Sequence, residues 1–310
     1  MADSIRVFAS ATVANVACGF DILGFAINEP GDEVILRRCA EPGISITTIT
    51  GDEGRLPYDT MKNTAGIAVA QFLDHTGITE GVEIELHKKM PLGSGMGSSA
   101  ASAVAAVFAA NKLFRDPLEV QALLPFTMAS EGVASGSAHA DNAAPSLLGG
   151  FILIRSYDPL DIVRIPTPDS LYCTLLHPQI EVLTDDARKI LKKHILLKDA
   201  IIQWGNVAGL IMGLTTSDYD LISRSMQDVI IEPVRSLLIP GYDAIKEAAI
   251  EAGALGCSIA GSGPSIFALN TSMETATTVG EAMQSACSAQ GIESELYISP
   301  INKNGPRVLE

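Results

Sequence analysis

Aromatic residues are scarce in this 310-residue chain: they make up 5% of it, and there is a single Trp. Basic residues are also few, since 21 Lys and Arg stand against 36 Asp and Glu, giving a formal net charge of −15. Nucleic acids and anionic membrane surfaces are both bound through Lys and Arg, so this balance argues against either partner. It still allows a small phosphorylated ligand, which backbone N–H groups and a metal ion can hold.

Paired cysteines and long apolar runs are absent from the sequence as well. The five cysteines are odd in number, far apart and never in a C-x-x-C pair, which predicts neither a disulfide framework nor a zinc site. Asp3 and Arg6 interrupt the region where a signal peptide needs an apolar core. No stretch reaches the roughly 18 apolar residues that a membrane-spanning helix requires. We therefore expect a soluble, cytoplasmic globular protein.

Hydrophobic residues nevertheless make up 47% of the chain, mostly as Ala, Val, Ile and Leu, a composition typical of helices packed on sheets. The length predicts two domains, and the Pro- and Asp-rich run Asp158–Asp169 is the expected seam between them. Alternating or short apolar runs predict strands over Ile5–Val13, Glu33–Arg38, Ile44–Ile49, Val82–His87, Phe151–Arg155, Leu171–Leu176, Gly256–Ala260, Ser265–Leu269 and Glu293–Ile298. Helical spacing predicts helices over Asn63–Thr76, Ala100–Phe114, Leu118–Ala129, Asp185–His194, Asp199–Leu214, Tyr242–Ala252 and Met273–Gln290. This order favours an α+β architecture with an antiparallel sheet.

The most informative local pattern is a glycine-rich loop that leads into an Ala-rich helix. It reads Pro91-Leu92-Gly93-Ser94-Gly95-Met96-Gly97-Ser98-Ser99-Ala100-Ala101. Each glycine permits a positive φ or a close approach to the backbone, and Ser98 or Ser99 is expected to cap the helix. The first N–H groups of a helix have no partner within it, and the helix dipole adds positive potential there. The loop is therefore predicted to bind an anion such as a diphosphate.

The sequence of this loop differs from those of two well-known phosphate-binding loops. A P-loop needs a lysine directly after its last glycine, but Ser98 follows Gly97. The dinucleotide-binding fingerprint needs glycine at the position that Ser98 occupies. From the residues alone, a tight turn before a buried helix remains an alternative to an anion site.

Three stretches together resemble the motifs of the GHMP kinases. The stretch Ala9–Gly24 resembles their first motif, the loop Pro91–Ala101 the second and Gly253–Leu269 the third. All three occur in the family's order, so the resemblance covers nearly the whole chain. The stretch Gly136–Pro145, with His139-x-Asp141-Asn142 ahead of a Gly-Gly strand, is similar to the branch that phosphorylates homoserine. Ser10, Ala17-Cys18, Met96 and Ala140 depart from the usual spelling without removing a reactive group.

The resemblance implies a two-domain α+β GHMP kinase fold. Residues 1–165 would form an N-terminal, ATP-binding α/β domain like ribosomal protein S5, and residues 166–310 a C-terminal ferredoxin-like domain. The implied activity is transfer of a phosphoryl group from ATP to the hydroxyl of L-homoserine, a step of threonine biosynthesis, with Mg²⁺ as the metal. The family also implies a homodimer.

The resemblance also implies which residues bind the nucleotide and the metal. Asn63 would lie on the nucleotide side, and Ser99 and Glu131 would hold Mg²⁺. The phosphates would be bound by Pro91, Leu92, Gly93, Ser94, Gly95, Met96, Gly97, Ser98, Ser99, Ala100, Ala101, Gly261 and Gly263. Taken alone, Asn63 is an ordinary N-cap, Glu131 a surface carboxylate and Gly261-Ser262-Gly263-Pro264 a hairpin turn.

The acceptor side follows from the same motifs. Homoserine is a zwitterion, so its ammonium group needs a carboxylate and its carboxylate needs a cation. Asp21 suits the first requirement, and Arg188 and Arg235 suit the second. The acceptor residues implied by the resemblance are Asn15, Asp21, His139, Arg188 and Arg235, with Asp141 as the catalytic residue that orients or deprotonates the hydroxyl. Without the resemblance, both arginines would be interpreted as solvated charges and His139 as a structural histidine.

Two alternatives remain at this stage. One is a kinase of the same fold that phosphorylates mevalonate or a sugar alcohol. The other is a nucleotide-binding regulator that has lost catalysis, which is expected to lack Glu131 or a loop serine, although both are present here.

Overall fold

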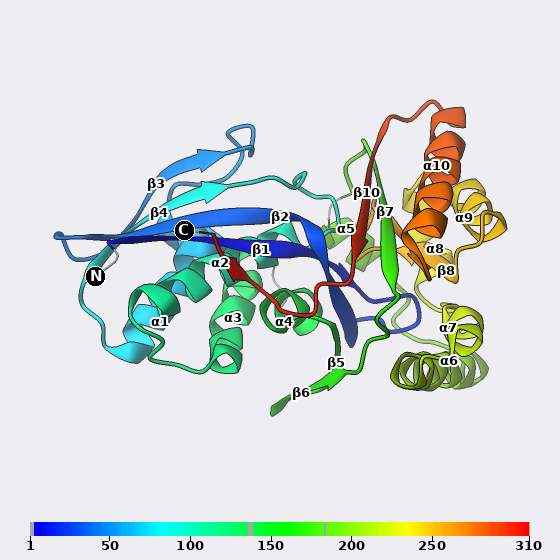
Figure 1. The fold of residues 1–310 in the computed structure, drawn as a ribbon, viewed down its shortest axis with the longest axis horizontal. Helices are drawn as coiled ribbons and strands as arrows, with labels where there is room; N and C mark the ends of the chain where they lie inside the picture. Colours follow the sequence, from blue (N-terminus) through cyan, green and yellow to red (C-terminus); the bar gives the residue numbers. More distant parts are fainter. Residues whose placement is uncertain (1–2, 136–138, 183, 310) are drawn as a thin grey trace.

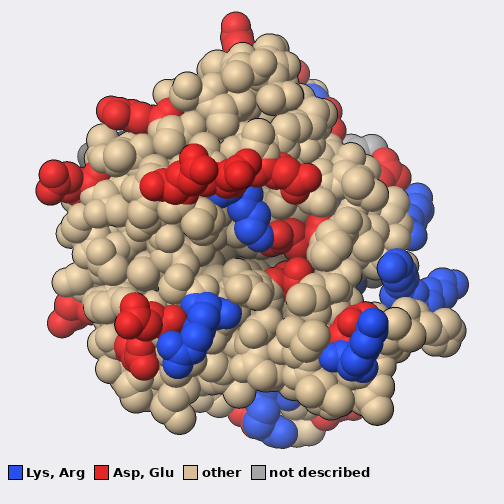
Figure 2. Space-filling view, turned by 90° about the vertical axis from the view of Figure 1, so that its right-hand side faces the viewer, with Lys and Arg blue, Asp and Glu red and all other residues tan. Residues whose placement is uncertain are grey.

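The computed structural model describes residues 3–135, 139–182 and 184–309. The chain forms two β-sheets that lie side by side, and each is covered by its own set of helices (Figure 1). On the face shown in Figure 2, acidic and basic side chains lie next to one another in several places, with large areas of uncharged surface around them. Within the described residues, no helix is long and apolar enough to cross a bilayer.

The first sheet has seven strands in a central order β11-β1-β2-β4-β3, and β5 pairs with β2 while β6 pairs with β5. Its strands are β1 (Ser4–Ala14), β2 (Leu23–Cys39), β3 (Ile44–Thr50), β4 (Gly81–His87), β5 (Phe151–Tyr157), β6 (Leu160–Ile165) and β11 (Arg307–Val308). Only the pairing of β3 with β4 is parallel among these neighbours. The last described residues of the chain thus return to the first sheet, where Val308 pairs with Val7.

Helices cover one face of this sheet (Figure 1). They are α1 (Thr64–Thr76), α2 (Ser98–Leu113), α3 (Leu124–Ser135), which follows the 3₁₀ turn η2 (Val120–Leu123), and α4 (Ala140–Leu148); the turn η1 (Thr60–Lys62) precedes α1. Helix α2 is buried on nearly all sides, because it packs against β1, β2 and the helices α1, α3 and α4. A helix that is apolar all round belongs in an interior, and the small alanine side chains of α2 let its neighbours approach closely.

The second sheet is antiparallel, in the order β10-β7-β9-β8, with α9 and α10 beside it (Figure 1). Its strands are β7 (Tyr172–Pro178), β8 (Gly256–Ile259), β9 (Ile266–Asn270) and β10 (Ser294–Pro300). The helices of this half are α5 (Thr184–Lys189), α6 (Leu197–Thr216), α7 (Tyr219–Ser225), α8 (Glu232–Arg235), α9 (Tyr242–Glu251) and α10 (Met273–Ala289), and η3 (Ser236–Leu238) is a 3₁₀ turn. Phe267 of β9 packs edge-on against Phe25 of β2, with ring centroids 5.8 Å apart, and so joins the two halves.

Four differences between the sequence expectations and the structure have identifiable reasons. The predicted helix Leu118–Ala129 starts as α3 only at Leu124, because Pro125 is tolerated in a first turn but not in a helix interior. The predicted helix Asp185–His194 ends at Lys189, where continuation would place Lys192 and Lys193 one turn after two other cations. Helix α4 was not expected, since it contains Pro145.

The fourth difference concerns the seam. The run Asp158–Asp169 contains β6, which pairs with β5 in the first sheet, so this part of the chain is not a bare linker. The strands of the first sheet come from residues 4–165 and 307–308, and those of the second from residues 172–300. A single cut between residues 165 and 166 therefore does not separate the two sheets.

Candidate active site

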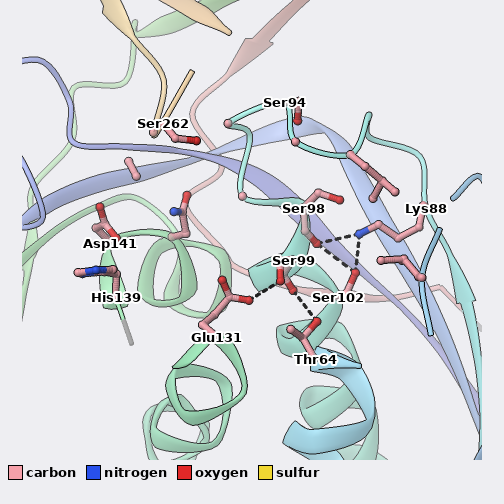
Figure 3. A pocket seen from close by; sticks show the side chains of 18 of the residues that line it. Thr64, Lys88, Ser94, Ser98, Ser99, Ser102, Glu131, His139, Asp141 and Ser262 are labelled. Carbon is pink, nitrogen blue, oxygen red and sulfur yellow. Dashed lines mark hydrogen bonds between the residues drawn. The ribbon is translucent and has the colours of Figure 1, made fainter. Parts of the chain in front are cut away.

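One cavity of about 360 Å³ lies where the two halves of the molecule meet. It is lined by the end of β1, the glycine-rich loop with the start of α2, the start of α4, and residues from α3, α5 and α8. Residues far apart in the sequence thus face one space, and Figure 3 shows Glu131, His139 and Asp141 around the start of α2. The cavity has a loop end near α2 and an acceptor end near α5 and α8.

The glycine-rich loop has the geometry that its glycines predict. Gly93, Gly95 and Gly97 have φ values of 69°, 79° and 70°. A Cβ atom at Gly95 would lie 2.5 Å from Ala260 O and 2.7 Å from Gly263 O, so only glycine fits where the Gly261–Pro264 turn meets the loop. This contact brings the second and third motifs together.

Helix α2 begins in the cavity without a side-chain cap. Gly97 is its N-cap residue, and no side chain accepts a hydrogen bond from the first turn, so the expected cap at Ser98 or Ser99 was wrong. The first N–H groups of a helix have no partner within it, and here no side chain caps them either. They lie where Gly97, Ser98 and Ser99 line the cavity. Such a helix start attracts an anion through its N–H groups and its dipole.

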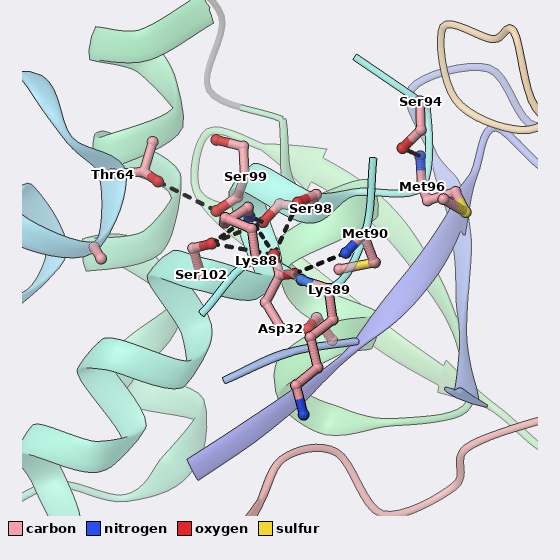
Figure 4. Close-up of polar contacts among 12 residues, drawn as sticks. Asp32, Thr64, Lys88, Lys89, Met90, Ser94, Met96, Ser98, Ser99 and Ser102 are labelled. Carbon is pink, nitrogen blue, oxygen red and sulfur yellow. Dashed lines mark hydrogen bonds and ion pairs between the residues drawn. The ribbon is translucent and has the colours of Figure 1, made fainter. Parts of the chain in front are cut away.

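A buried ion pair contacts the start of α2 and holds it in place (Figure 4). Lys88 Nζ pairs with Asp32 Oδ2, and their side chains are 2% and 0% exposed. Lys88 also donates to Ser98 O at 2.9 Å and to Ser102 Oγ at 2.7 Å. Ser98 Oγ donates to Asp32 Oδ2 at 2.8 Å, and the Lys89 N–H donates to Asp32 Oδ1 at 2.8 Å. Sequence reasoning missed Lys88 and Asp32 because neither belongs to a motif and a charged residue is by default solvated.

The next polar group faces the start of α2 from α3. Ser99 Oγ donates a hydrogen bond of 2.6 Å to Glu131 Oε1 (Figure 3). Burial raises the pKa of Glu131, while the Ser99 hydrogen bond and the positive charge of Lys88 lower it. No group of three or more His, Cys, Asp and Glu suited to a metal occurs in the described parts of the chain. Ser99 and Glu131 still fit Mg²⁺, which takes oxygen ligands and commonly only one or two from the protein, with phosphates and waters completing its shell.

Charges of both signs meet at the acceptor end. Arg188 Nη2 and Nη1 donate to Asp21 Oδ1 and Oδ2 at 3.0 and 3.3 Å. Asn15 Oδ1 accepts from the Asp21 N–H at 3.0 Å, and both residues have positive φ, so the first motif holds Asp21 in a fixed turn. Arg235 is buried and donates to Ala187 O at 3.2 Å and Gly261 O at 2.9 Å. Burial, followed by the charge of Arg188, lowers the pKa of Arg235 to about 10, which leaves it cationic at neutral pH.

Two side chains at this end have buried polar atoms without hydrogen-bond partners among the described residues. Asp141 is 3% exposed, and its Oδ1 has no hydrogen-bond partner among the described residues. Burial, followed by the charge of Asp21, raises the pKa of Asp141 to about 7. Both ring nitrogens of His139 are likewise without a hydrogen bond there, although Nδ1 lies 3.7 Å from Asp21 Oδ1. Burial lowers the pKa of His139. Buried polar groups normally have partners, so such exceptions point to a bound ligand.

The cavity brings together most of the residues predicted for the site. Those that line it are Asn15, Asp21, Asn63, Leu92, Gly93, Ser94, Gly95, Gly97, Ser98, Ser99, Glu131, His139, Asp141, Arg188, Arg235 and Gly261. Asn63 caps α1, because its Oδ1 accepts from the Ala65 N–H at 3.1 Å, so the alternative of an ordinary N-cap is confirmed.

Five predicted residues do not line it: Pro91, Met96, Ala100, Ala101 and Gly263. Three of these, Met96, Ala100 and Ala101, are buried in the core, where they support the loop from below. Residues 136–138, which open the His139 stretch, lie outside the described part of the chain.

Further cavity residues were missed at the sequence level: Lys62, Thr64, Lys88, Ser102, Asn142 and Ser262. Asn142 adjoins Asp141, and its Oδ1 accepts a hydrogen bond of 2.8 Å from Thr12 Oγ1. Its position in the His139-x-Asp141-Asn142 pattern was a usable signal, as were the places of Lys62 and Thr64 on either side of Asn63.

Comparisons with known proteins bear on the family and the fold of this chain. The description "GHMP kinases N terminal domain" matches residues 63–150, and "GHMP kinases C terminal" matches residues 210–289. A homoserine kinase of Chlorobium phaeobacteroides is 57% identical over 318 residues, covering 99% of each chain. The crystal structure of homoserine kinase from Cytophaga hutchinsonii is 60% identical, has a TM-score of 0.98 and is matched over 100% of this chain and 98% of its own.

A more distant structure shares the fold alone. L. major mevalonate kinase, solved in complex with R-mevalonate, is 17% identical with a TM-score of 0.70, covering 95% of each chain. The two-domain GHMP kinase fold predicted from the motifs is thus confirmed. At this identity and coverage, the chain belongs to the GHMP kinase family and, within it, to the homoserine kinases.

Proposed function

We propose that this chain transfers the terminal phosphoryl group of ATP to the side-chain hydroxyl of L-homoserine, giving O-phospho-L-homoserine and ADP in threonine biosynthesis. The observation that carries the proposal is a single cavity with an anion-binding helix start at one end and paired acidic and basic side chains at the other. Full-length similarity to homoserine kinases supports the same reaction.

The loop end suits the phosphates of ATP. The unpartnered N–H groups at the start of α2 and the positive-φ backbone of Gly93, Gly95 and Gly97 would bind the phosphate oxygens. Ser99 and Glu131 would hold Mg²⁺, which supplies charge neutralisation to the phosphates when it is bound. Lys88 would add a positive charge behind the loop and keep α2 in place.

The acceptor end suits a zwitterionic amino acid. Asp21 would bind the ammonium group of homoserine, and the guanidinium groups of Arg188 and Arg235 would bind its carboxylate. Arg188 and Asp21 pair with each other in the structure, so each would exchange part of that pairing for the substrate. Asn15 would keep Asp21 in position, and the unpartnered ring of His139 would donate or accept one further hydrogen bond.

Asp141 would act on the hydroxyl. It lines the cavity, its Oδ1 is buried without a hydrogen-bond partner among the described residues, and a pKa of about 7 leaves a substantial fraction of the carboxylate ionised at neutral pH. The homoserine oxygen would attack the terminal phosphorus of ATP while its proton passes to Asp141 and ADP leaves. Because such transition states are loose, orientation of the hydroxyl by Asp141 contributes alongside proton transfer.

The charge pattern also separates the alternatives. Mevalonate and sugar alcohols have no ammonium group, so they would make no use of Asp21, which would keep only its pairing with Arg188. A non-catalytic regulator would not need the Ser99–Glu131 pair. ADP release should therefore be measured with ATP and Mg²⁺ in the presence of L-homoserine, mevalonate, galactose or no acceptor. Turnover only with L-homoserine is the expected result, and equal turnover with mevalonate or galactose would refute the assignment.

Two further parts of the proposal concern the setting of the enzyme. We infer a cytoplasmic enzyme, in keeping with five free cysteines, four of which are buried. We also infer that it works as a homodimer, an expectation from the family that the next section develops.

A further inference from the structure

The surface around α6 carries an unusual concentration of exposed apolar side chains. Of the large hydrophobic residues that are exposed in the described parts of the chain, eight lie between residues 190 and 212. They are Ile190, Ile195, Leu196, Leu197, Ile201, Ile202, Trp204 and Met212. The only Trp of the protein is among them, and it is 63% exposed. Single exposed apolar residues are common, but a concentration of them often marks a site of interaction with another molecule.

The spacing of these residues defines one face of the helix. Ile201, Gly205, Ala208 and Met212 follow one another at intervals of four, three and four, which places them on a single stripe. Together with Trp204 they form what we call the α6 face, and all five are exposed. The opposite side of α6, with Ala200, Gln203, Leu210 and Leu214, is buried. Figure 1 shows that α6 lies at the edge of the molecule, below α7.

The centre of the α6 face is small as well as apolar. Gly205 and Ala208 occupy the middle of the stripe, and a Cβ atom at Gly205 would have no neighbour within 4 Å. The interaxial distance of packed helices depends on the side chains at the contact, so two small residues allow a second helix to approach closely. A helix of 20 residues is about 30 Å long, enough for an extended helix–helix contact.

Opposite charges flank the two ends of the face. Lys192, Lys193 and Lys198 lie before or at the start of α6, and Asp218 and Asp220 follow its end. All five are exposed, and none forms an ion pair with another described residue. Asp199 also lies in the first turn of α6, so this end is basic on balance, in a protein with a net charge of −15. A helix packed antiparallel on α6 would need a basic start and an acidic end to complement these charges, and a second copy of α6 has both.

We propose that two copies of this chain associate through the α6 face, with their α6 helices antiparallel about a twofold axis near Gly205 and Ala208. In such an interface the same surface is used on both subunits. Ile201 of one copy would then contact Met212 of the other, and Lys198 would lie beside the acidic end of its partner's helix. The inference rests on the homodimer proposed above and assigns its interface.

Sedimentation analysis of the full-length chain over a range of concentrations tests this assignment. The wild-type protein is expected to form a species of about twice 32.6 kDa. Ala208→Arg should raise the dimer dissociation constant by at least about 30-fold, as expected for the centre of an interface. Ala244→Arg is the matched control, because Ala244 is exposed on α9, away from the α6 face, and it should leave the dimer intact. Circular dichroism and the Tm of both variants should match the wild type.

The single Trp provides a second readout of the same surface. Trp204 emission of the wild type should move to shorter wavelength as dimers form, and it should stay at long wavelength in Ala208→Arg at every concentration. A wild-type protein that remains monomeric would refute the dimer itself. A dimer that survives Ala208→Arg with unchanged Trp204 emission would overturn the assigned face and leave the proposed dimer and reaction in place.

Charge reversal tests the antiparallel arrangement. Lys198→Glu should raise the dissociation constant of the dimer by repulsion from the acidic end of the partner's helix. Adding Asp220→Lys to that variant should bring the constant back toward the wild-type value. If the second substitution weakens the dimer further instead, the antiparallel arrangement is wrong.

Discussion

The substitution Asp141→Asn separates the functional role of this carboxyl group from its cost to stability. Burial and the charge of Asp21 raise the pKa of Asp141 from 3.8 to about 7 in the folded protein. The folded state therefore keeps this proton up to about pH 7, whereas the unfolded chain releases it near pH 4. The free energy of unfolding falls as the pH rises through this window. The reason is that the unfolded chain releases the Asp141 proton readily, whereas the folded protein still holds it.

The size of the effect follows from the difference in pKa. Three pKa units correspond to about 4 kcal/mol above pH 7. About 3 kcal/mol of this should develop between about pH 5 and about pH 8, with the remainder already present at the lower pH. Asparagine has a similar shape but no charge, so Asp141→Asn removes the pH-dependent cost. The same variant should lose about 10²-fold or more in kcat, because asparagine cannot accept the proton that Asp141 takes from the homoserine hydroxyl in the proposed mechanism.

Urea unfolding of the wild type and of Asp141→Asn at these two pH values measures the effect. The variant should gain about 3 kcal/mol over the wild type on going from the lower to the higher pH. Asp243→Asn, at an exposed position early in α9, serves as the control and should show nearly the same difference at both pH values. An Asp141→Asn variant with the same stability difference at both pH values would refute the raised pKa. A near-normal kcat would show that Asp141 is not the base.

Three other substitutions test the remaining parts of the site. Glu131→Gln should lower kcat by about 10²-fold and weaken the response of the rate to Mg²⁺ concentration; an unchanged Mg²⁺ titration would argue against a metal ligand. Arg188→Met should raise KM for L-homoserine by about 10-fold or more with little change in KM for ATP, and steady-state kinetics with each substrate varied would expose the opposite pattern. Lys88→Met leaves Asp32 as an unpaired buried charge and should lower the free energy of unfolding by about 3–5 kcal/mol. Urea unfolding should show recovery when Asp32→Asn is added, and no recovery would contradict the buried ion pair.

The conformation of the glycine-rich loop and many of the residues that line the cavity could be predicted, because short stretches of the sequence indicate them. Positive φ values at Gly93, Gly95 and Gly97 require glycine, and the alternation of these glycines is visible without a structure. Asp21 and Asp141 lie within recognisable motifs, so their meeting in one cavity follows once the family fold is known.

The support behind the loop could not be predicted in the same way. Asp32 and Lys88 are 56 positions apart, and neither a spacing rule nor a motif links them. A lysine near the end of a strand is usually solvated, yet Lys88 is buried, where it contacts Asp32 of β2 and Ser98 and Ser102 of α2. The return of the chain to the first sheet could not be predicted from the sequence either, because β11 has only two residues and depends on its pairing with β1.

The account depends most on where ATP and the amino acid lie in the cavity. A crystal structure with a non-hydrolysable ATP analogue, Mg²⁺ and L-homoserine tests this directly. The triphosphate should follow the backbone from Gly93 to Ser99, with the homoserine ammonium group at Asp21 and its hydroxyl between Asp141 and the terminal phosphate. A triphosphate bound elsewhere on the molecule, or a homoserine outside this cavity, would contradict the account.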